Sequence, residues 1–502
     1  MGGGRSARRP RARAAPGRAL LVPLALASAL LATTGCTVPI ERGTFNDFFV
    51  KDYNLPAYRR DEAALGRRRH LGAPTAASGA VGGLAGALAG GRLRAWSASA
   101  GGAVGGMGGA LLGRTLMRTE QLEPLPARYQ ALTLALPIIA TDPNKGPTFG
   151  LLPVAVFKEQ DRITNILAPD LTYNEIDGYG GAFRMRRFFS TDAALELDLA
   201  GSSEGAFNNR VVFSQRRVGP RQFLFYRGEV SYLTDLSTRF YGLGNDTEED
   251  DEASYVLRQT LFAATFGVQL PLDFTLELQE RVASYKVGPG RLDGVRSARA
   301  AFPGVEGMRG RTTLLTHRLQ LTYDSRDARG APTRGVLAQF TYEIADTTLG
   351  SGADFQRFGL SVTALFPKFK KRFVTAARAA GWIVTGDDVP FYALTQLGGK
   401  HTHRGYGQGR FVDQNGWLAS VEERWNVTSL DLMGTKAVLQ LAGFLDAGRV
   451  LPEGGGFKLD KAKLAAGAAI RLVLPDSDLV TSIDVGFSDE GPAAFVGLDY
   501  PF

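Results

Sequence analysis

The chain ends in the sequence FVGLDYPF, residues 495–502, in which large apolar side chains alternate with small or polar ones. In an extended strand, successive side chains point to opposite faces, so Val496, Leu498, Tyr500 and Phe502 share one face. The opposite face carries the small and polar residues Gly497, Asp499 and Pro501. The ending therefore predicts a terminal β-strand with one apolar and one polar face.

The same period of two begins at about residue 129 and recurs along the rest of the chain. It is strict in residues 195–199 (LELDL), 274–279 (FTLELQ) and 319–324 (LQLTYD), and weaker in 438–441 (VLQL). About 16 segments of roughly ten residues show this pattern. Alternation of this kind predicts strands that each have one apolar face.

Two all-β architectures fit this alternation. A soluble sandwich buries the apolar face, whereas a transmembrane barrel turns it toward lipid and keeps polar side chains in a wet lumen. The number of strand segments and the chain's ending favour the barrel, since the ending resembles the recognition signal of bacterial outer-membrane barrels. We therefore expect an antiparallel transmembrane β-barrel of about 16 strands over residues 129–502, with Tyr500 and Phe502 in an interfacial aromatic girdle. The alternative is a soluble edge strand that ends in Phe by chance.

The composition argues against nucleic-acid binding, disulfides and metal sites. The chain has 502 residues, of which 44% are hydrophobic and 22% are charged, and its net charge is +8. Six Arg and no acidic residue lie in residues 1–35, so removing that segment leaves +2. A nearly neutral mature chain does not favour a nucleic-acid partner. The one Cys and four His argue against disulfides, a zinc site or another metal cofactor.

Residues 1–35 have the layout of a secretory signal peptide. An Arg-rich start precedes the apolar run 19–32 (ALLVPLALASALLA), which is too short to span a membrane comfortably. Cys36 follows Gly35, an arrangement that resembles the lipobox of bacterial lipoproteins, although Thr33 replaces the usual Leu. We expect export and lipidation of Cys36; the alternative is ordinary cleavage beside an incidental Cys.

A Gly-rich region separates the leader from the strands. Residues 71–91 and 95–113 contain no charged side chain, and a short Arg-Leu-Arg segment divides them. Glycines recur there every four residues, at Gly82, Gly86, Gly90, Gly101, Gly105, Gly109 and Gly113. On helices this spacing forms a small-residue stripe that allows close packing in a membrane. Residues 71–113 are thus a glycine-zipper hairpin or, alternatively, a flexible linker, between connectors at 36–70 and 114–128.

Residues 397–411 (LGGKHTHRGYGQGRF) carry a Gly-Gly pair, an Arg-Gly-Tyr triplet and an Arg-Phe pair. This order closely resembles the inward-folded loop of the BamA/TamA-type outer-membrane assembly factors. The same family pattern is matched upstream by residues 239–245 (RFYGLGN) and by the strand–turn residues Asp324, Arg326, Asp327 and Gly335. Residues 421–424 (VEER) and 444–448 (FLDAG) match the strands after the loop, and five strand-like segments follow it, as in the family.

The resemblance implies roles for the loop residues. Arg404 would be held in the lumen by Glu422 and Asp446, with Phe444 packed on its guanidinium group. Alternation also places these wall residues on the lumenal face, where an unpaired charge is costly. Gly405 permits close approach of the backbone, and Tyr406 packs on the wall. The alternative is an exposed loop on which Arg404 touches nothing.

The chain departs from the family before residue 129. Residues 37–128 show no pattern of the periplasmic POTRA domains that receive client proteins. The resemblance implies a non-enzymatic barrel without cofactors that helps insert or export proteins or lipids at the bacterial outer membrane. Its expected partners are outer-membrane lipids or lipopolysaccharide, the machinery that inserts the barrel itself, and periplasmic proteins. A structural surface-antigen barrel or a narrow pore without insertase activity remains the alternative.

Overall fold

The computed structural model describes residues 129–502 except 160–161, 191, 219–222, 329–330, 433–434, 456–457, 474–479 and 498–499. The predicted signal peptide at 1–35, the lipidation of Cys36, the connectors and the glycine zipper at 71–113 lie outside the described residues. All of the described residues belong to one compact unit. Among these residues, no helix has the length and hydropathy needed to cross a membrane.

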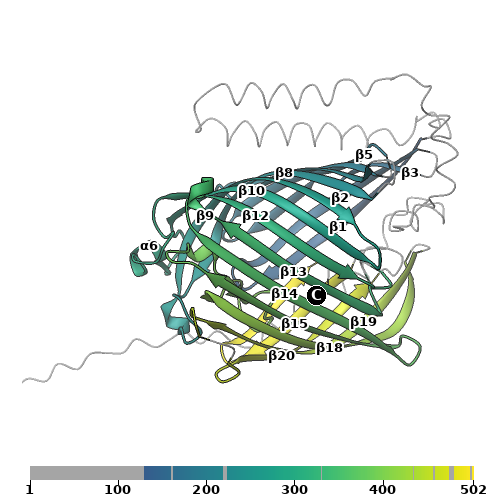
Figure 1. The fold of residues 1–502 in the computed structure, drawn as a ribbon. Coiled ribbons are helices and arrows are strands. Elements are labelled where there is room, and N and C mark those ends of the chain that lie inside the picture. Colours follow the sequence, from purple (N-terminus) through teal and green to yellow (C-terminus); the bar gives the residue numbers. More distant parts are fainter. Residues whose placement is uncertain are drawn as a thin grey trace, which may run out of the picture. The chain divides into compact units, whose positions relative to one another are not determined.

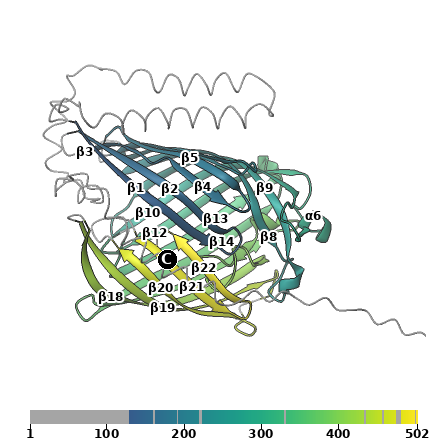
Figure 2. The same cartoon turned by 180° about the vertical axis from the view of Figure 1, so that it is seen from behind.

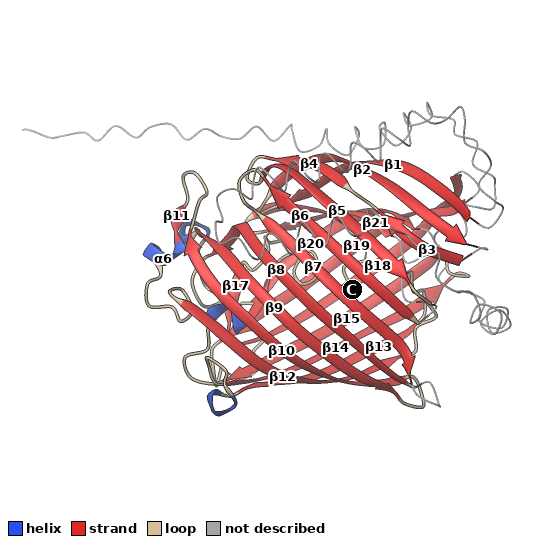
Figure 3. Cartoon of the chain, turned by 90° about the horizontal axis from the view of Figure 1, so that it is seen from above, coloured by secondary structure: helices blue, strands red, loops and turns tan. Residues whose placement is uncertain are grey.

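Strands make up nearly all of the regular structure (Figure 3). The first half of the wall contains β1 (Tyr129–Asp142), β2 (Gly146–Glu159), β3 (Arg162–Leu167), β4 (Asp170–Asn174), β5 (Gly178–Phe188), β6 (Ala193–Ser202), β7 (Phe207–Val218), β8 (Leu224–Phe240), β9 (Ala253–Gln269) and β10 (Phe274–Pro289). The second half contains β12 (Arg311–Asp324), β13 (Gly335–Ala345), β14 (Phe355–Lys368), β15 (Phe373–Thr385), β18 (Asn415–Leu432), β19 (Thr435–Leu451), β20 (Lys463–Val473), β21 (Val480–Ser488) and β22 (Gly491–Gly497).

Short elements lie in the loops. They are the 3-10 helices η1 (Glu249–Asp251), η2 (Thr347–Leu349) and η3 (Phe391–Ala393), the helix α6 (Ala298–Ala301), and the strands β11 (Arg296–Ser297), β16 (Thr395–Leu397) and β17 (Phe411–Asp413).

The wall is one sheet of neighbouring antiparallel strands that curls into a barrel (Figure 1). The sheet contains 20 strand segments. Because β3 and β4 both pair with β2 and β5, they form one interrupted strand, and β11 is a two-residue addition. The wall therefore has 18 strand positions, two more than the sequence suggested, while the all-β barrel itself is confirmed. Five strands, β18 to β22, follow the long loop at 386–414, as the sequence predicted.

The sheet closes where its first and last strands meet. In Figure 2, β1 and β22 face each other across a seam, and Cα atoms of the two strands come within contact distance. Over the described residues no backbone ladder joins β1 to β22, whereas each is paired with its other neighbour, β2 and β21 respectively. The seam thus differs from every other boundary of the wall.

The barrel is apolar outside and charged inside. Large apolar side chains on the outer face are exposed, including Phe262 (54%), Leu360 (54%), Leu445 (64%) and Ile470 (48%). Charged side chains that alternate with such residues are buried in the lumen. A water-soluble protein would have the reverse arrangement, so this wall is built to contact lipid.

A Glu–His pair interrupts the apolar outer face of the wall. Glu280 of β10 lies directly opposite His317 of β12, and their side chains are 2.5 Å apart. They share the outer face with Leu278, Val282 and Leu319, which are each about two-fifths exposed. Polar groups that face hydrocarbon are costly even when they pair with each other.

Replacing this pair tests the orientation of the wall. We expect Glu280→Leu/His317→Leu to raise the free energy of unfolding of the barrel by about 1–4 kcal/mol, because the double variant removes a polar pair from lipid. Urea titration of the barrel in lipid vesicles measures this change. The Glu280→Leu single variant, which leaves His317 unpaired, should be less stable than the double variant. A double variant less stable than either single variant would contradict a lipid-facing pair.

Candidate functional site

The loop at residues 386–414 folds back into the barrel between β15 and β18. Its arms form a short antiparallel ladder, in which Leu397 of β16 lies opposite Phe411 of β17. Gly398 and Gly399 turn the chain with φ values of +114° and +98°, a region that disfavours side chains. A Cβ on Gly398 would lie 2.1 Å from the carbonyl oxygen of Gly407, so the tip of the loop closes only with glycine there.

Arg404 lies at the tip of this loop and is 1% exposed. Its Nε and Nη2 each donate a hydrogen bond of 2.8 Å to the carboxylate of Asp446, and its Nη1 donates one of 2.5 Å to Glu422. The backbone N–H of Arg404 also donates to Asp446, at 3.1 Å. The Phe444 ring covers the guanidinium group at 3.6 Å from its centroid. The structure thus brings together the four residues that the resemblance linked.

The sequence prediction missed half of the charged cluster around Glu422. Arg424 donates to Glu422 at 2.7 Å and Arg471 does so at 2.5 Å, while Arg471 also donates to Asp484 at 2.7 Å. The whole cluster contains three guanidinium groups and three carboxylates, on Arg404, Arg424, Arg471, Glu422, Asp446 and Asp484, each no more than 2% exposed. These charges balance, and mutual hydrogen bonds replace part of the lost water.

Gly405 and Tyr406 fit against the strands beside the seam. A Cβ on Gly405 would lie 2.5 Å from the Ala465 side chain, so the loop packs there only with glycine. Tyr406 is 1% exposed, and its hydroxyl donates a hydrogen bond of 2.5 Å to Asp489. Burial and the neighbouring Asp489 charge raise the pKa of Tyr406, which therefore remains a proton donor at neutral pH.

Arg410 connects the same loop to the upstream segment at 239–245. Its guanidinium carbon lies 4.2 Å from the Tyr241 ring centroid, and its Nε donates to Glu490 at 2.9 Å. The backbone N–H of Gly244 donates to the carbonyl of Val412 at 2.8 Å. Two motifs that are about 170 residues apart in the sequence are therefore neighbours in the fold.

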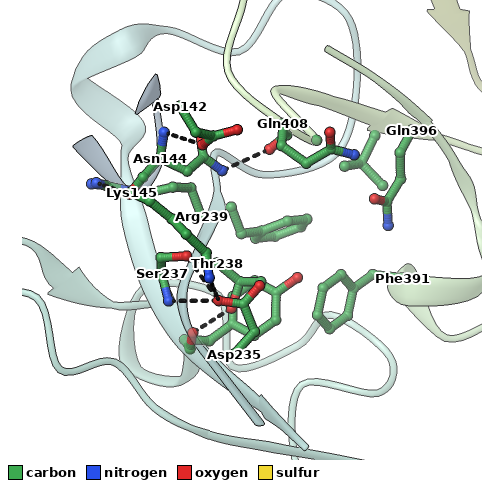
Figure 4. A pocket seen from close by; sticks show the side chains of 14 residues that line it. Asp142, Asn144, Lys145, Asp235, Ser237, Thr238, Arg239, Phe391, Gln396 and Gln408 are labelled. Atoms are coloured by element: carbon green, nitrogen blue, oxygen red, sulfur yellow. Dashed lines mark hydrogen bonds and ion pairs between the residues drawn. The ribbon is translucent and has the colours of Figure 1, made fainter. Parts of the chain in front are cut away.

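A polar cavity of about 240 Å³ lies between the loop and the turn that joins β1 to β2 (Figure 4). Asp142, Asn144 and Lys145 contribute to it from the turn, Asp235 and Arg239 from β8. In Figure 4 the Asn144 side chain points toward Gln408 of the loop, and a hydrogen bond joins them.

A model of the Omp85 superfamily domain matches residues 173–486 of this chain. The chain belongs to the Omp85 superfamily. Together with the apolar outer face, this membership places the barrel in the bacterial outer membrane.

Among solved structures, the chain resembles BamA from Haemophilus ducreyi lacking POTRA domains 1–3, with 15% identity, 78% of each chain covered and a TM-score of 0.50. CdiB from Acinetobacter baumannii is 12% identical over 76% of this chain and 61% of that chain, with a TM-score of 0.39. CdiB from Escherichia coli is 13% identical over 76% and 64%, also with a TM-score of 0.39. No curated protein matches the sequence.

The C-terminal aromatic residues of this Omp85 barrel lie inside it, so the expectation of an aromatic girdle is wrong. The Tyr500 ring centroid is 4.0 Å from the guanidinium carbon of Arg424, and its hydroxyl donates to Gln440 at 3.2 Å. Phe502 packs against an apolar cluster on β14 and β15 formed by Leu365, Val374 and Ala376. A guanidinium partner and an amide acceptor exist in the lumen and not in lipid, which explains the inward orientation. A role for these residues as an assembly signal stays a prediction.

The strand–turn residues lie at the opposite end of the barrel wall from the loop tip. Arg326 donates to Asp324 at 2.8 Å, and a Cβ on Gly335 would lie 2.4 Å from the Ser325 carbonyl oxygen. Partial burial opposes ionisation of Asp327, but hydrogen bonds from Thr333 and Arg334 lower the pKa of Asp327 to about 2. The turn therefore loses this charged acceptor only as the pH falls from about 4 toward 2.

Within the described part of the chain, no group of three His, Cys, Asp or Glu side chains is arranged to hold a metal ion. His403 is buried, its Nε2 lies 2.8 Å from the Lys463 carbonyl oxygen, and burial lowers the pKa of its imidazole. Residues 201–205 (GSSEG) match the G-x-S-x-G spacing of a hydrolase nucleophile, but they lie at the end of β6 and in its turn toward β7, not in a strand-to-helix turn.

Removing the Arg404 side chain tests the charged cluster. Arg404→Ala leaves Glu422 and Asp446 without their shared cation, so we expect a loss of roughly 3–5 kcal/mol in the free energy of unfolding. Heat-modified mobility on gels and urea titration measure it. Arg186→Ala, which removes a half-exposed Arg paired with Glu196, is the matched control and should change little. Equal stability of Arg404→Ala and the wild type would refute the structural role.

Proposed function

We propose that this barrel helps insert or export proteins at the outer membrane by opening the seam between β1 and β22. The observation that carries the proposal is the seam itself, where two neighbouring strands have no ladder between them over the described residues. Membership of the Omp85 superfamily supports it. Lipids are a second class of cargo that the same opening would serve.

An edge strand is a template for another strand. β1 is 14 residues long and pairs on one side with β2 along its whole length. Its other edge presents backbone N–H and C=O groups that a client strand can pair with. Because hydrocarbon leaves unpaired backbone groups unsatisfied, a client strand at the seam would lower the free energy of both chains.

The filled lumen argues against a wide open pore. The loop at 386–414 occupies the interior, and its charged contacts with β18, β19 and β21 are buried. We therefore propose that transport through the barrel is gated by this loop and that the seam is the main route. A structural barrel without insertase activity predicts the same filled lumen but a seam that never opens.

We further propose a non-enzymatic role and cooperation with separate periplasmic proteins. The proposed mechanism needs only strand pairing and a change of barrel shape, so it requires no catalytic group or cofactor. Residues 37–128 lack the pattern of client-receiving domains in the sequence, and partner proteins would supply that function. Co-purification with residues 37–128 as bait identifies such partners.

Crosslinking the seam tests the proposed function. Thr141 and Val496 line the same cavity on opposite sides of the seam. We expect proteoliposomes with the Thr141→Cys/Val496→Cys barrel, in a Cys36→Ser background, to insert a model barrel client. Treatment with a bismaleimide crosslinker should then reduce insertion at least tenfold, because the seam can no longer part.

Each single-cysteine variant, treated with the same reagent, is the control and should retain insertion. Failure of the uncrosslinked barrel to insert the client would favour a structural role. Full insertion by the crosslinked barrel would show that the route does not pass through the seam. Planar-bilayer conductance of the same samples distinguishes a narrow open pore from a barrel whose lumen is filled by the loop.

A further inference from the structure

The tip of the long loop, residues 404–410, contacts the last hairpin of the wall. That hairpin is formed by β21, which ends at Ser488, and β22, and its turn consists of Asp489 and Glu490. The Ser488 hydroxyl donates to the carbonyl oxygen of Gly405 at 2.8 Å. Asp489 accepts from the hydroxyl of Tyr406, and Glu490 accepts from Arg410. The loop tip is thereby attached to the C-terminal edge of the seam.

The same tip also contacts the first hairpin, on the other side of the seam. Asn144, in the turn between β1 and β2, is 9% exposed, and its Nδ2 donates to the carbonyl oxygen of Gln408 at 3.0 Å. A Cβ on Gly407 would lie 2.5 Å from Oδ1 of Asn144, so this approach requires glycine. Arg239 of β8 donates to the Asn144 carbonyl at 3.0 Å and holds the turn on its own side.

Between these two attachments the edges are separated by a cavity of about 350 Å³. It is lined from one side by residues of the first hairpin, such as Thr141 and Thr148, and from the other by Phe495 and Val496 of β22. Gln408, whose carbonyl oxygen binds Asn144, also lines it. The loop tip therefore connects the two edges at a place where the wall itself is not sealed.

We propose that residues 404–410 form a clasp that holds the seam closed at the loop end of the barrel, with Asn144 and Gly407 as its releasable half. Gly405 lies against Ala465 of β20 and Ser488 of the last hairpin, and Gly407 faces the first hairpin, so the glycines on either side of Tyr406 let one backbone touch both edges. The biological meaning of the clasp rests on the proposed opening of the seam, but its existence does not.

The two halves of the clasp differ in chemical strength. The attachment to the last hairpin uses the carboxylates of Asp489 and Glu490 and is supported by the buried Arg404 cluster. The attachment to the first hairpin uses a neutral amide hydrogen bond. Because hydrogen bonds to charged groups are about twice as strong as neutral ones, the first hairpin releases first and the loop stays with the C-terminal edge.

Distance measurements across the seam test the clasp. Nitroxide labels are attached at Thr141→Cys and Val496→Cys in the full chain, which also carries Cys36→Ser and is placed in lipid nanodiscs. Pulsed electron paramagnetic resonance then measures the distance between the labels and so the population of open seams. We expect Asn144→Ala to raise the fraction of open seams about three- to tenfold, because it removes one neutral hydrogen bond. Gly407→Ala should raise it as well, because the new Cβ displaces the Asn144 side chain.

Matched controls separate the clasp from general loosening. Gln408→Ala keeps the backbone carbonyl that accepts from Asn144 and should leave the open fraction unchanged. Gly443→Ala adds a Cβ with no atom within 4 Å and should also change nothing. Adding Gly407→Ala to Asn144→Ala should have no further effect, since the atom that the Cβ meets is gone.

An unchanged distance distribution in Asn144→Ala and Gly407→Ala, with heat-modified mobility intact, overturns the clasp. The same variants in the client-insertion assay keep the two proposals distinct. A seam that opens in Asn144→Ala without any client insertion supports the clasp and contradicts the proposed function. If both variants insert the client as the wild type does and their distances across the seam are unchanged, the clasp is contradicted but the proposed function is not.

Discussion

The interior of this barrel depends on the buried pairing of Arg404 with Glu422 and Asp446. A guanidinium group without water is tolerated only when each of its faces and donors is satisfied, and here two carboxylates and the Phe444 ring do so. Because Arg404 belongs to a loop and its partners belong to the wall, the same contacts that neutralise the charge fix the loop in the lumen. The positions of Tyr406 and Arg410 follow from that anchor.

The anchor also links the loop to the seam. The wall strands that hold Arg404 are β18, β19 and β21, which lie on the C-terminal side of the seam. The loop therefore moves with that side, while its tip reaches the turn between β1 and β2. A loop that is fixed to one edge and lightly attached to the other is suited to control when the edges part.

The period of two in the sequence predicted most of the wall correctly, because burial in lipid and burial in a wet lumen impose opposite demands on alternate residues. Arg471 and Asp484 escaped prediction because their pairing depends on the register of β20 and β21, which no local pattern reveals. Tyr500 and Phe502 were assigned to the wrong side of the wall, since an aromatic residue at a chain end suits either a membrane interface or a cation in the lumen. The strand number was underestimated because short turns, such as the one between β1 and β2, hide strand boundaries.

The most direct test of this account is a double-mutant cycle between Arg404 and Asp446, with the free energy of unfolding of the barrel in lipid vesicles as the readout. If the buried pair holds the loop, Arg404→Ala/Asp446→Ala should lose little more stability than either single variant, with a coupling of about 2 kcal/mol or more. Additive losses, with a coupling near zero, would show that the two residues act independently and that the loop is held in the lumen by something else.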